Sequence, residues 1–459
     1  MTVPAPNLYG PEVQGRRFTV MGLARTGEAV ARFLAARGAE VTVTDQRSED
    51  DLADVLSRLP QEVALELGGH PPTLFEETDG VVVSPGVPRE HPLLARTAAA
   101  GVPVMSEIEL AFRFCEAPVI GVTGTNGKTT TVSLISALLQ SAGLRAPAAG
   151  NIGSPFIAAL TGPDPPDFMV VEVSSFQLEW VETFRPRVAV VTNITPDHLD
   201  RHQDLEEYVD WKRRIFASQE ADDFLILNAD DGRVRAFAEE ARAEVRFFSR
   251  SETISDGACL EDDRLVLRTG GRSETVLRRE AFPLHGVHNV ENALAAVAAS
   301  AICGASLEAM GRALKAFRPI EHRLALVRER RGVRWYNDSK GTNVGAAVRS
   351  IESFDDPIVL IAGGRDKHSD LTPLRPLVRN RVKALILIGE SRARFRSAFA
   401  GLTECIEAGS MHEAVEAADR TAKTGDVVLL SPACASFDMF TDYEDRGRAF
   451  SAEVEKLAP

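Results

Sequence analysis

The chain has 459 residues, of which 44% are hydrophobic and 26% charged, and its formal net charge is −14. At roughly 100–200 residues per domain, this length predicts two to four domains, and the composition is that of a soluble globular protein. The negative charge argues against a broad nucleic-acid surface, which requires clustered positive charge, although it is compatible with a local basic pocket for a small anion.

The cysteines and the apolar segments indicate a reducing, aqueous compartment. The five cysteines are scattered without a C-x-x-C pair, which suits buried thiols and offers no metal framework. Residues 1–15 contain no apolar signal core, and the most apolar helix-like run, 293–305, is shorter than the ~20 residues that a bilayer span requires. We therefore expect a cytoplasmic protein that binds neither nucleic acid nor membrane. A monomer is expected as well, although the sequence does not fix the oligomeric state.

Strands and helices alternate in the amino-terminal part of the chain. Residues 17–21 have the pattern of a buried strand, 26–37 that of a helix, and 40–44 that of a second strand. A further strand, 81–83, runs into the turn Ser84-Pro85-Gly86. This alternation is typical of a parallel sheet with helices on both faces.

Two further units repeat the pattern. The second begins near Pro118 with a strand at 119–122, a glycine-rich turn and a helix at 129–142, and the third begins near Arg318. The other predicted buried strands are 168–173, 188–192 and 224–227 in the second unit and 358–362, 384–388 and 427–430 in the third. We predict three doubly wound α/β domains with ligand sites at the carboxyl ends of their strands.

The turn 22–27 joins the first strand to the first helix, and Asp45 ends the next strand about twenty residues later. This arrangement can hold a nucleotide phosphate at a helix N-terminus, with the acid near a ribose hydroxyl. Because Ala24 occupies the middle glycine position of the G-x-G-x-x-G fingerprint, a tight turn that needs small residues explains the pattern equally well.

The segment 121–130, Gly-Val-Thr-Gly-Thr-Asn-Gly-Lys-Thr-Thr, is the strongest single motif. Its glycines let backbone N–H groups approach phosphate oxygens, Lys128 adds a cation, and the Thr129 hydroxyl can serve Mg²⁺. The segment departs from the strict G-x-x-x-x-G-K-[ST] pattern, because Val122 stands at the first glycine position. It predicts a phosphate-binding loop, with a purely structural glycine turn as the alternative.

Several candidate metal ligands follow this loop. Glu172 ends an apolar strand of the same predicted sheet, and Mg²⁺ bound to a triphosphate needs only one or two protein carboxylates. His198 and His202 are four residues apart, but no H-E-x-x-H motif or nearby cysteine supports a zinc site. Local features favour an ordinary loop residue for His198. They also favour a place on a solvated basic face for Lys212, on a predicted helix at 205–217.

Together these segments resemble the Mur ligases of peptidoglycan synthesis over essentially the whole chain. The motifs that resemble those shared by these ligases are Thr-Gly-Thr-Asn-Gly-Lys-Thr at 123–129, Glu-Val-Ser-Ser-Phe-Gln at 172–177, Gly-Val-His-Asn-Val-Glu-Asn at 286–292 and Pro-Ile-Glu-His-Arg at 319–323. The carboxyl third is most similar to the branch that adds D-glutamate, through 337–343, 363–367 and 431–438. The D-N-P-R motif of the diaminopimelate-adding branch is absent from the sequence.

The resemblance implies a function for each domain. A Rossmann-like domain at 1–106 would bind the UDP-linked substrate, a P-loop ATPase-like domain at 107–317 would bind ATP, and a Rossmann-like domain at 318–459 would bind the amino acid. It implies an ATP-dependent ligase that activates UDP-N-acetylmuramoyl-L-alanine as an acyl phosphate and captures it with D-glutamate. This step would serve cell-wall biogenesis, cell shape and cell division.

The resemblance also implies roles for individual residues. ATP would contact Gly124, Thr125, Asn126, Gly127, Lys128, Thr129, Thr130, Asn289, Asn292, Arg323 and Asp338. Two Mg²⁺ ions would be held by Thr129, Glu172, His198 and a carbamylated Lys212. The catalytic residues would be Lys128, His198 and Lys212. Arg213 and Arg214 follow Lys212 in the sequence, and we expect that they could help to hold the carbamate. The UDP-linked substrate would contact Thr26, Asp45, Arg47, Ser84, Pro85, Gly86, Asn151, Ser174, Gln177 and His198, and D-glutamate would contact Lys340, Thr342, Lys367, Ser436 and Tyr443.

Three alternatives remain open from the sequence. Another ligase on the same scaffold, such as a folylpolyglutamate synthase or a different Mur ligase, would differ only in its substrates. A non-catalytic sugar-nucleotide-binding regulator would keep the phosphate loop, but it would have no need of Glu172, His198 and Lys212. A hydride-transferring dehydrogenase fits least well, because of Ala24.

Overall fold

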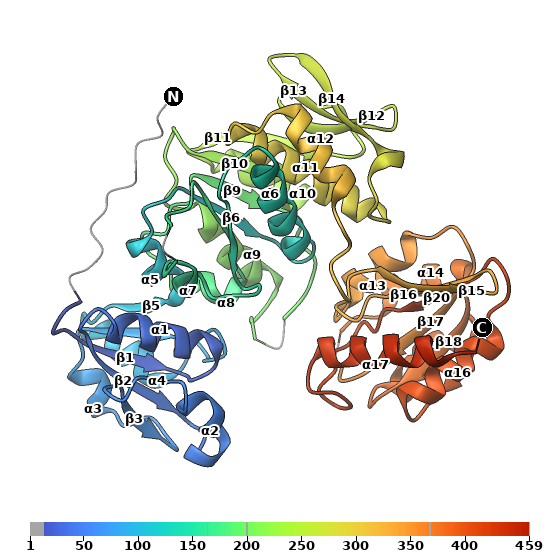
Figure 1. The fold of residues 1–459 in the computed structure, drawn as a ribbon. Helices are drawn as coiled ribbons and strands as arrows, with labels where there is room; N and C mark the ends of the chain where they lie inside the picture. The colour runs from blue at the N-terminus through green and yellow to red at the C-terminus, as the bar shows by residue number, and fades with distance from the viewer. Residues whose placement is uncertain (1–12, 163, 199–200, 367–368, 459) are drawn as a thin grey trace. The chain divides into compact units, whose positions relative to one another are not determined.

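The computed structural model describes residues 13–162, 164–198, 201–366 and 369–458. Within these ranges the strands form three sheets (Figure 1). The chain divides into two compact units. The first contains residues up to 194, 206–278 and 292–314, and the second contains 195–205, 279–291 and the chain from 315 onward. None of the described helices has both the length and the apolar character needed to cross a membrane.

The amino-terminal sheet is entirely parallel and has the order β3-β2-β1-β4-β5. Its strands are β1 (Arg17–Met21), β2 (Glu40–Asp45), β3 (Ala64–Leu67), β4 (Gly80–Val83) and β5 (Val104–Ser106), and its helices are α1 (Arg25–Ala35), α2 (Glu49–Leu56), α3 (Thr73–Glu76) and α4 (Pro92–Ala99). The predicted strands correspond to β1, β2 and β4, which are largely buried. Neither β3 nor β5 was predicted from the sequence; the residues of β3 are mostly exposed and form no apolar run, and β5 has only three residues.

The central sheet has the order β14-β13-β12-β11-β10-β9-β6-β8-β7. Its strands are β6 (Val119–Thr123), β7 (Ala148–Gly150), β8 (Met169–Glu172), β9 (Val188–Val191), β10 (Phe224–Asn228), β11 (Glu244–Ser249), β12 (Gly257–Glu261), β13 (Arg264–Thr269) and β14 (Arg272–Arg278). The strands from β12 to β7 are parallel, whereas β13 and β14 are antiparallel to their neighbours. The predicted α/β sheet is thus extended by an antiparallel hairpin that the sequence analysis did not anticipate.

The helices of this region are short except for α6 and α11. They are α5 (Glu107–Phe114), α6 (Lys128–Ser141), α7 (Phe156–Ala159), α8 (Ser175–Leu178), α9 (Leu205–Arg213), α10 (Gly232–Ala236), α11 (Val287–Ile302) and α12 (Leu307–Ala316), with 3-10 turns η1 (Arg214–Phe216), η2 (Phe237–Glu239) and η3 (Arg279–Ala281). The helix predicted at 205–217 is therefore wrong in its last four residues, because the chain tightens into η1 after Arg213.

The carboxyl-terminal sheet has the order β15-β16-β20-β17-β18-β19 and is parallel except for β15. Its strands are β15 (Ala325–Arg330), β16 (Val333–Asn337), β17 (Ile358–Gly363), β18 (Val382–Ile388), β19 (Glu404–Glu407) and β20 (Val427–Leu430). Its helices are α13 (Val344–Glu352), α14 (Arg375–Arg381), α15 (Arg392–Phe399), α16 (Met411–Thr421) and α17 (Tyr443–Lys456), with the 3-10 turn η4 (Thr372–Leu374).

Helices cover both faces of this sheet (Figure 1). Side chains alternate along a strand, so Leu360 of β17 packs with α13, α14 and α15, whereas its neighbour Ile361 packs with α16 and α17. Because both faces are buried, the central strands are continuous apolar runs, which is why their positions were predictable.

Candidate active site

The loop between β6 and α6 requires glycine at two positions. Gly124 has a φ of +139°, and a Cβ there would lie 2.0 Å from Thr192 Oγ1. Gly127 has a φ of +86°, and a Cβ there would lie 2.2 Å from Asn292 Oδ1. Both the backbone conformation and the close neighbours therefore exclude a side chain at these two positions.

Residues directly after β9 support this loop. Asn193 Oδ1 accepts a hydrogen bond from the Asn126 N–H at 3.0 Å, and Asn193 Nδ2 donates to the Asn126 carbonyl at 2.8 Å. Thr192 Oγ1 donates to the same carbonyl at 2.7 Å, and the Thr125 N–H donates to the Asn193 carbonyl at 2.8 Å. The sequence analysis missed this role of Asn193. Its position at the end of a strand that neighbours β6 is the signal that could have revealed it.

Lys128 begins α6, and its side chain turns back over the loop. Its ammonium donates to the carbonyls of Gly124 at 2.9 Å and Thr125 at 2.8 Å. The side chain is only partly buried. Thr130, two residues further on, is buried in α6.

Thr129 and Glu172 form a pair of oxygen ligands beside the loop. Glu172 ends β8, next to β6 in the sheet, and is 2% exposed. Thr129 Oγ1 donates to Glu172 Oε2 at 2.7 Å, and Asn151 Nδ2 donates to Glu172 Oε1 at 2.9 Å. The described residues contain no cluster of three or more His, Cys, Asp or Glu side chains that could hold a metal. A hydroxyl and a carboxylate are oxygen groups of the kind that Mg²⁺ prefers.

Lys212 is buried, with 1% of its surface exposed, and its ammonium donates to the Gly124 carbonyl at 2.8 Å. The ammonium also lies 4.4 Å from the ring centre of Tyr208, whose hydroxyl donates to Thr125 Oγ1 at 3.1 Å. The local interpretation of Lys212 as part of a solvated basic face is therefore wrong. Two helical residues four apart, Tyr208 and Lys212, approach the phosphate loop together.

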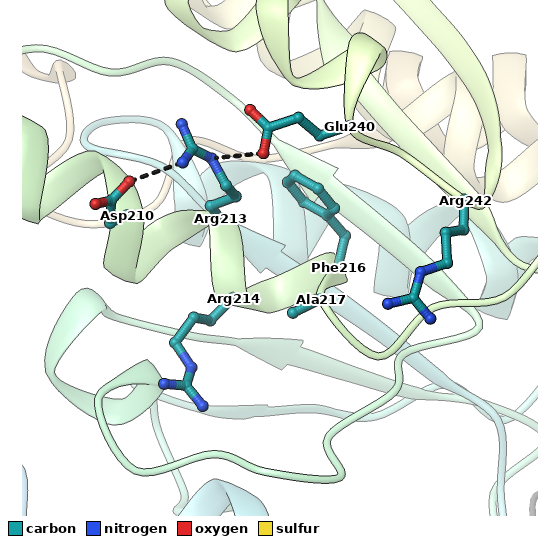
Figure 2. A pocket seen from close by; sticks show the side chains of 7 residues that line it. All are labelled: Asp210, Arg213, Arg214, Phe216, Ala217, Glu240 and Arg242. Carbon is teal, nitrogen blue, oxygen red and sulfur yellow. Dashed lines mark hydrogen bonds and ion pairs between the residues drawn. The ribbon is translucent and has the colours of Figure 1, made fainter.

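Arg213 and Arg214 do not accompany Lys212. Figure 2 shows them in a separate pocket of about 370 Å³, where Arg213 forms ion pairs with Asp210 at 2.8 Å and Glu240 at 3.3 Å. Arg214 donates to the Val181 carbonyl at 2.5 Å. The expectation that these arginines help to hold a carbamate on Lys212 is wrong, because successive helical side chains point in different directions.

The two asparagines of the motif at 286–292 fall in different units. Asn292, buried in the first unit, contacts the phosphate loop and accepts a hydrogen bond from Thr131 Oγ1 at 3.3 Å. Asn289, in the second unit, donates to the His285 carbonyl at 2.7 Å.

Asp338 is a buried acid in the carboxyl-terminal unit. It accepts hydrogen bonds from Ser350 Oγ at 2.6 Å and Ser431 Oγ at 2.9 Å. Burial raises its pKa to about 6, against the opposing effects of these hydroxyls and of the Arg323 charge. The structure thus brings two predicted nucleotide contacts, Arg323 and Asp338, into electrostatic contact.

Asp45 and Arg47 form a polar cluster at the carboxyl end of β2. Asp45 accepts hydrogen bonds from the Leu23 N–H at 2.7 Å and from Arg47 Nη2 at 2.9 Å. Burial opposes ionisation, but the hydrogen bonds and charge of Arg47 outweigh it and hold the pKa of Asp45 well below its usual range. Thr26, partly buried, lies in the first turn of α1. The predicted turn and acid therefore meet, as a nucleotide-binding site requires.

Further predicted UDP-substrate contacts of the first unit lie in the turn after β4 and at the start of α8. Ser84, in the Ser84-Pro85-Gly86 turn after β4, donates to the Gly22 carbonyl at 2.7 Å. Ser174 and Gln177 form the capping box of α8: the Gln177 N–H donates to Ser174 Oγ at 3.3 Å, and the Ser174 N–H donates to Gln177 Oε1 at 3.0 Å.

His198 belongs to the second unit, in the segment 195–205. Its backbone has a φ of +55°, and its N–H donates to Asp197 Oδ1 at 2.9 Å. Asp197 Oδ2 in turn accepts from Asn343 Nδ2 at 2.7 Å. The segment around His198 and the motif at 337–343 are therefore linked by a hydrogen bond within the second unit.

The predicted glutamate contacts lie on two loops and α17 of the carboxyl-terminal unit. The Lys340 ammonium lies 3.8 Å from the ring centre of Tyr443, and the Thr342 N–H donates to the Lys340 carbonyl at 2.7 Å. Ser436 is 2% exposed. Lys367 lies outside the described residues.

Comparisons with known proteins show which family the chain belongs to. Family models match the chain over 16–106 (Mur ligase MurD-like, N-terminal domain), 122–300 (Mur ligase middle domain) and 322–434 (Mur ligase, glutamate ligase domain). The UDP-N-acetylmuramoylalanine--D-glutamate ligase of Geotalea daltonii is 49% identical, covering 97% of this chain and 99% of its own. The same-named ligase of Syntrophus aciditrophicus is 44% identical, covering 98% and 100%.

Solved structures show the same fold. The UDP-N-acetylmuramate-alanine ligase of Thermotoga maritima matches with a TM-score of 0.61 and 17% identity, covering 96% of this chain and 99% of its own. The MurF ligase of Thermotoga maritima in complex with ADP also matches with a TM-score of 0.61, at 15% identity and 98% and 100% coverage. These matches confirm the predicted fold class, and the sequence relatives confirm the family: the chain belongs to the Mur ligases.

Proposed function

We propose that this chain joins D-glutamate to UDP-N-acetylmuramoyl-L-alanine, with conversion of ATP to ADP and phosphate, in the synthesis of the peptidoglycan precursor. The observation that carries the proposal is 44–49% identity along nearly the whole chain to ligases named for this reaction. The phosphate loop and its oxygen ligands supply the matching chemistry.

The reaction must bring together two anions. An oxygen of the alanine carboxylate attacks the γ-phosphorus of ATP, the bond to the β–γ bridging oxygen breaks, and ADP leaves. The amine of D-glutamate then attacks the acyl carbon, loses a proton and expels phosphate. Lys128 and the loop N–H groups oppose the repulsion between the carboxylate and the triphosphate.

The residues proposed to contact ATP are Gly124, Thr125, Asn126, Gly127, Lys128, Thr129, Thr130, Asn289, Asn292, Arg323 and Asp338. Thr129 and Glu172 would hold one Mg²⁺, and their oxygens, 2.7 Å apart beside the loop, fit such an ion. His198 and a carbamylated Lys212 would serve a second. When bound, the ions would neutralise charge on the transferring phosphoryl group.

The two other substrates would bind at strand ends of the outer sheets. The UDP part would contact Thr26, Asp45, Arg47 and the Ser84-Pro85-Gly86 turn, while Asn151, Ser174, Gln177 and His198 would contact the muramoyl-alanine part. D-glutamate would contact Lys340, Thr342, Lys367, Ser436 and Tyr443. The cationic lysines suit a substrate with two carboxylates.

Three properties of the whole protein belong to the same proposal. The domains would divide at 106/107 and 317/318, which the limits of the matched family models support. The protein would act as a monomer in the cytoplasm, without membrane or nucleic acid.

The direct test measures ADP release by the full chain with ATP, Mg²⁺, UDP-N-acetylmuramoyl-L-alanine and one amino acid at a time. Release with D-glutamate alone supports the proposal. Release with L-glutamate, meso-diaminopimelate or L-alanine instead would assign a different ligase activity. No amino-acid-dependent release would indicate a non-catalytic protein.

A further inference from the structure

Arg446 of α17 is a buried cation, 1% exposed, that forms no ion pair with an acidic side chain among the described residues. Its Nε donates to Ser339 Oγ at 3.0 Å and its Nη2 to the Ser339 carbonyl at 2.8 Å. Its Nη1 donates to the carbonyls of Cys434 at 3.1 Å and Ala435 at 3.3 Å. One guanidinium thus joins two loops that are about a hundred residues apart in the sequence.

Stability alone does not account for this residue. Removing a guanidinium from water without a carboxylate partner costs free energy, which its hydrogen bonds to neutral groups must offset. Burial lowers the pKa of Arg446 to about 10, against the opposing effects of Cys434, Asp438 and Asp338. The side chain is therefore still a cation at neutral pH.

The two loops that Arg446 joins each lead into a residue proposed to contact D-glutamate. Ser339 directly precedes Lys340, and Ala435 directly precedes Ser436. Ser339 Oγ also donates to the Tyr443 carbonyl at 2.7 Å, so a third proposed contact is attached to the same cluster. A guanidinium is planar and its donors point in fixed directions, so it can fix the distance between the two loops. A lysine ammonium, on a flexible stem, cannot do so in the same way.

We propose that Arg446 is a positioning residue for the amino-acid substrate: it fixes the spacing between Lys340 and Ser436, and its charge complements the two carboxylates of D-glutamate. This inference rests on the proposed function. It concerns the binding of one of the three substrates, so the loss of Arg446 should affect the amino acid selectively.

The test compares Arg446→Met, which removes the charge and the hydrogen bonds, with Arg446→Lys, which keeps only the charge. Arg448→Met is the matched control, because Arg448 is exposed on the same helix and pairs with Asp445 at 3.7 Å. For each full-length variant, ADP release is measured while D-glutamate, ATP and the UDP-linked substrate are varied in turn, and Tm is measured by thermal unfolding.

We expect the KM for D-glutamate to rise at least about tenfold in Arg446→Met and less in Arg446→Lys. The other two KM values should stay within about twofold, and the control should match the wild type. An unchanged KM for D-glutamate in either variant, or equal increases in all three KM values, would overturn the inference. If Arg446→Met does not fold, the three KM values of Arg446→Lys are compared with those of the wild type instead.

The wild-type protein separates this inference from the proposed function. If the wild type releases ADP with a different amino acid, the proposed function fails, and the same KM comparison is made with that amino acid. If no amino acid supports release, the inference fails together with the proposed function.

Discussion

The ammonium of Lys212 lies 2.8 Å from the carbonyl oxygen of Gly124, 88 positions away in the sequence. Gly124 is the glycine that opens the phosphate loop, and a side chain there would collide with Thr192. The lysine and the loop are thus packed together in the interior. This relationship makes Lys212 the most informative residue for testing the site.

Replacing Lys212 by Ala should lower turnover by about 10- to 100-fold, the usual cost of losing a group that supports a metal site. An ammonium cannot ligate Mg²⁺, but reaction of the neutral amine with CO₂ gives an oxygen-ligand anion on the same stem. A small carboxylic acid such as acetate should therefore partly restore the activity of Lys212→Ala. Arg213→Ala, which alters the separate pocket of Figure 2, should not respond to acetate. Wild-type turnover in Lys212→Ala would rule out the carbamate.

Replacing Lys128 by Ala should lower ADP formation by roughly 10²–10³-fold, the typical cost of removing one donor that stabilises developing negative charge. Tm should change little, because the side chain is partly exposed and contacts the carbonyls of its own loop. ADP release and thermal unfolding, measured on the same preparation, check both statements. Normal turnover in this variant would contradict the phosphate-loop assignment.

Replacing Gly127 by Ala should abolish nucleotide binding and lower Tm. The new Cβ would lie 2.2 Å from Asn292 Oδ1 in a backbone conformation with a φ of +86°. Gly143 has the same φ, but no atom lies within 4 Å of the place that a Cβ would occupy there, so Gly143→Ala isolates the backbone strain. Titration of each variant with ATP compares the two. Equal losses of ATP affinity in Gly127→Ala and Gly143→Ala would show that the contact with Asn292 is unimportant.

Replacing Lys340 by Ala should raise the KM for D-glutamate much more than that for ATP. Losing a charge-assisted hydrogen bond costs roughly 1.5–3 kcal/mol, which corresponds to about a 10- to 150-fold change in KM. The interaction with the Tyr443 ring is lost as well, so Tyr443→Phe, which keeps an aromatic ring, is the control. Similar changes in both KM values would contradict the assignment of Lys340 to the amino acid.

Glu107 should make stability depend on pH near neutrality. Its Oε1 accepts a hydrogen bond from the Ile157 N–H at 2.6 Å, its Oε2 is buried without a hydrogen bond in the described structure, and burial raises its pKa to about 7. The folded state therefore binds the proton more tightly than the unfolded state. The stabilisation is complete below about pH 4.5 and is lost as pH rises through 7, by a total on the order of 3 kcal/mol.

Glu107→Gln should remove this part of the pH dependence, because a neutral amide keeps the acceptor for the Ile157 N–H without titrating. Tm measured from pH 5 to 8 should fall more steeply in the wild type than in this variant. Glu182→Gln, at a side chain that is 82% exposed, serves as the control. Parallel curves for the wild type and Glu107→Gln would show that the buried carboxyl does not titrate in this window.

The sequence by itself determined the positions of the buried strands and the phosphate loop. The strand β17 is apolar at almost every position because helices cover both of its faces, and this signal is local. Gly124 and Gly127 are likewise local signals, since their backbone conformations exclude other residues. The resemblance to the Mur ligases rested on several such segments together, and the relatives confirmed it.

Only the tertiary structure decided which polar side chains meet. Lys212 and Arg213 are neighbours in a basic run, yet the first reaches the Gly124 carbonyl and the second pairs with Glu240. The supporting role of Asn193 and the link from Arg446 to Ser339 depend on segments that approach one another only in the folded chain. Hydropathy and spacing describe one segment at a time, whereas these contacts depend on strand order and on the direction of each helical side chain.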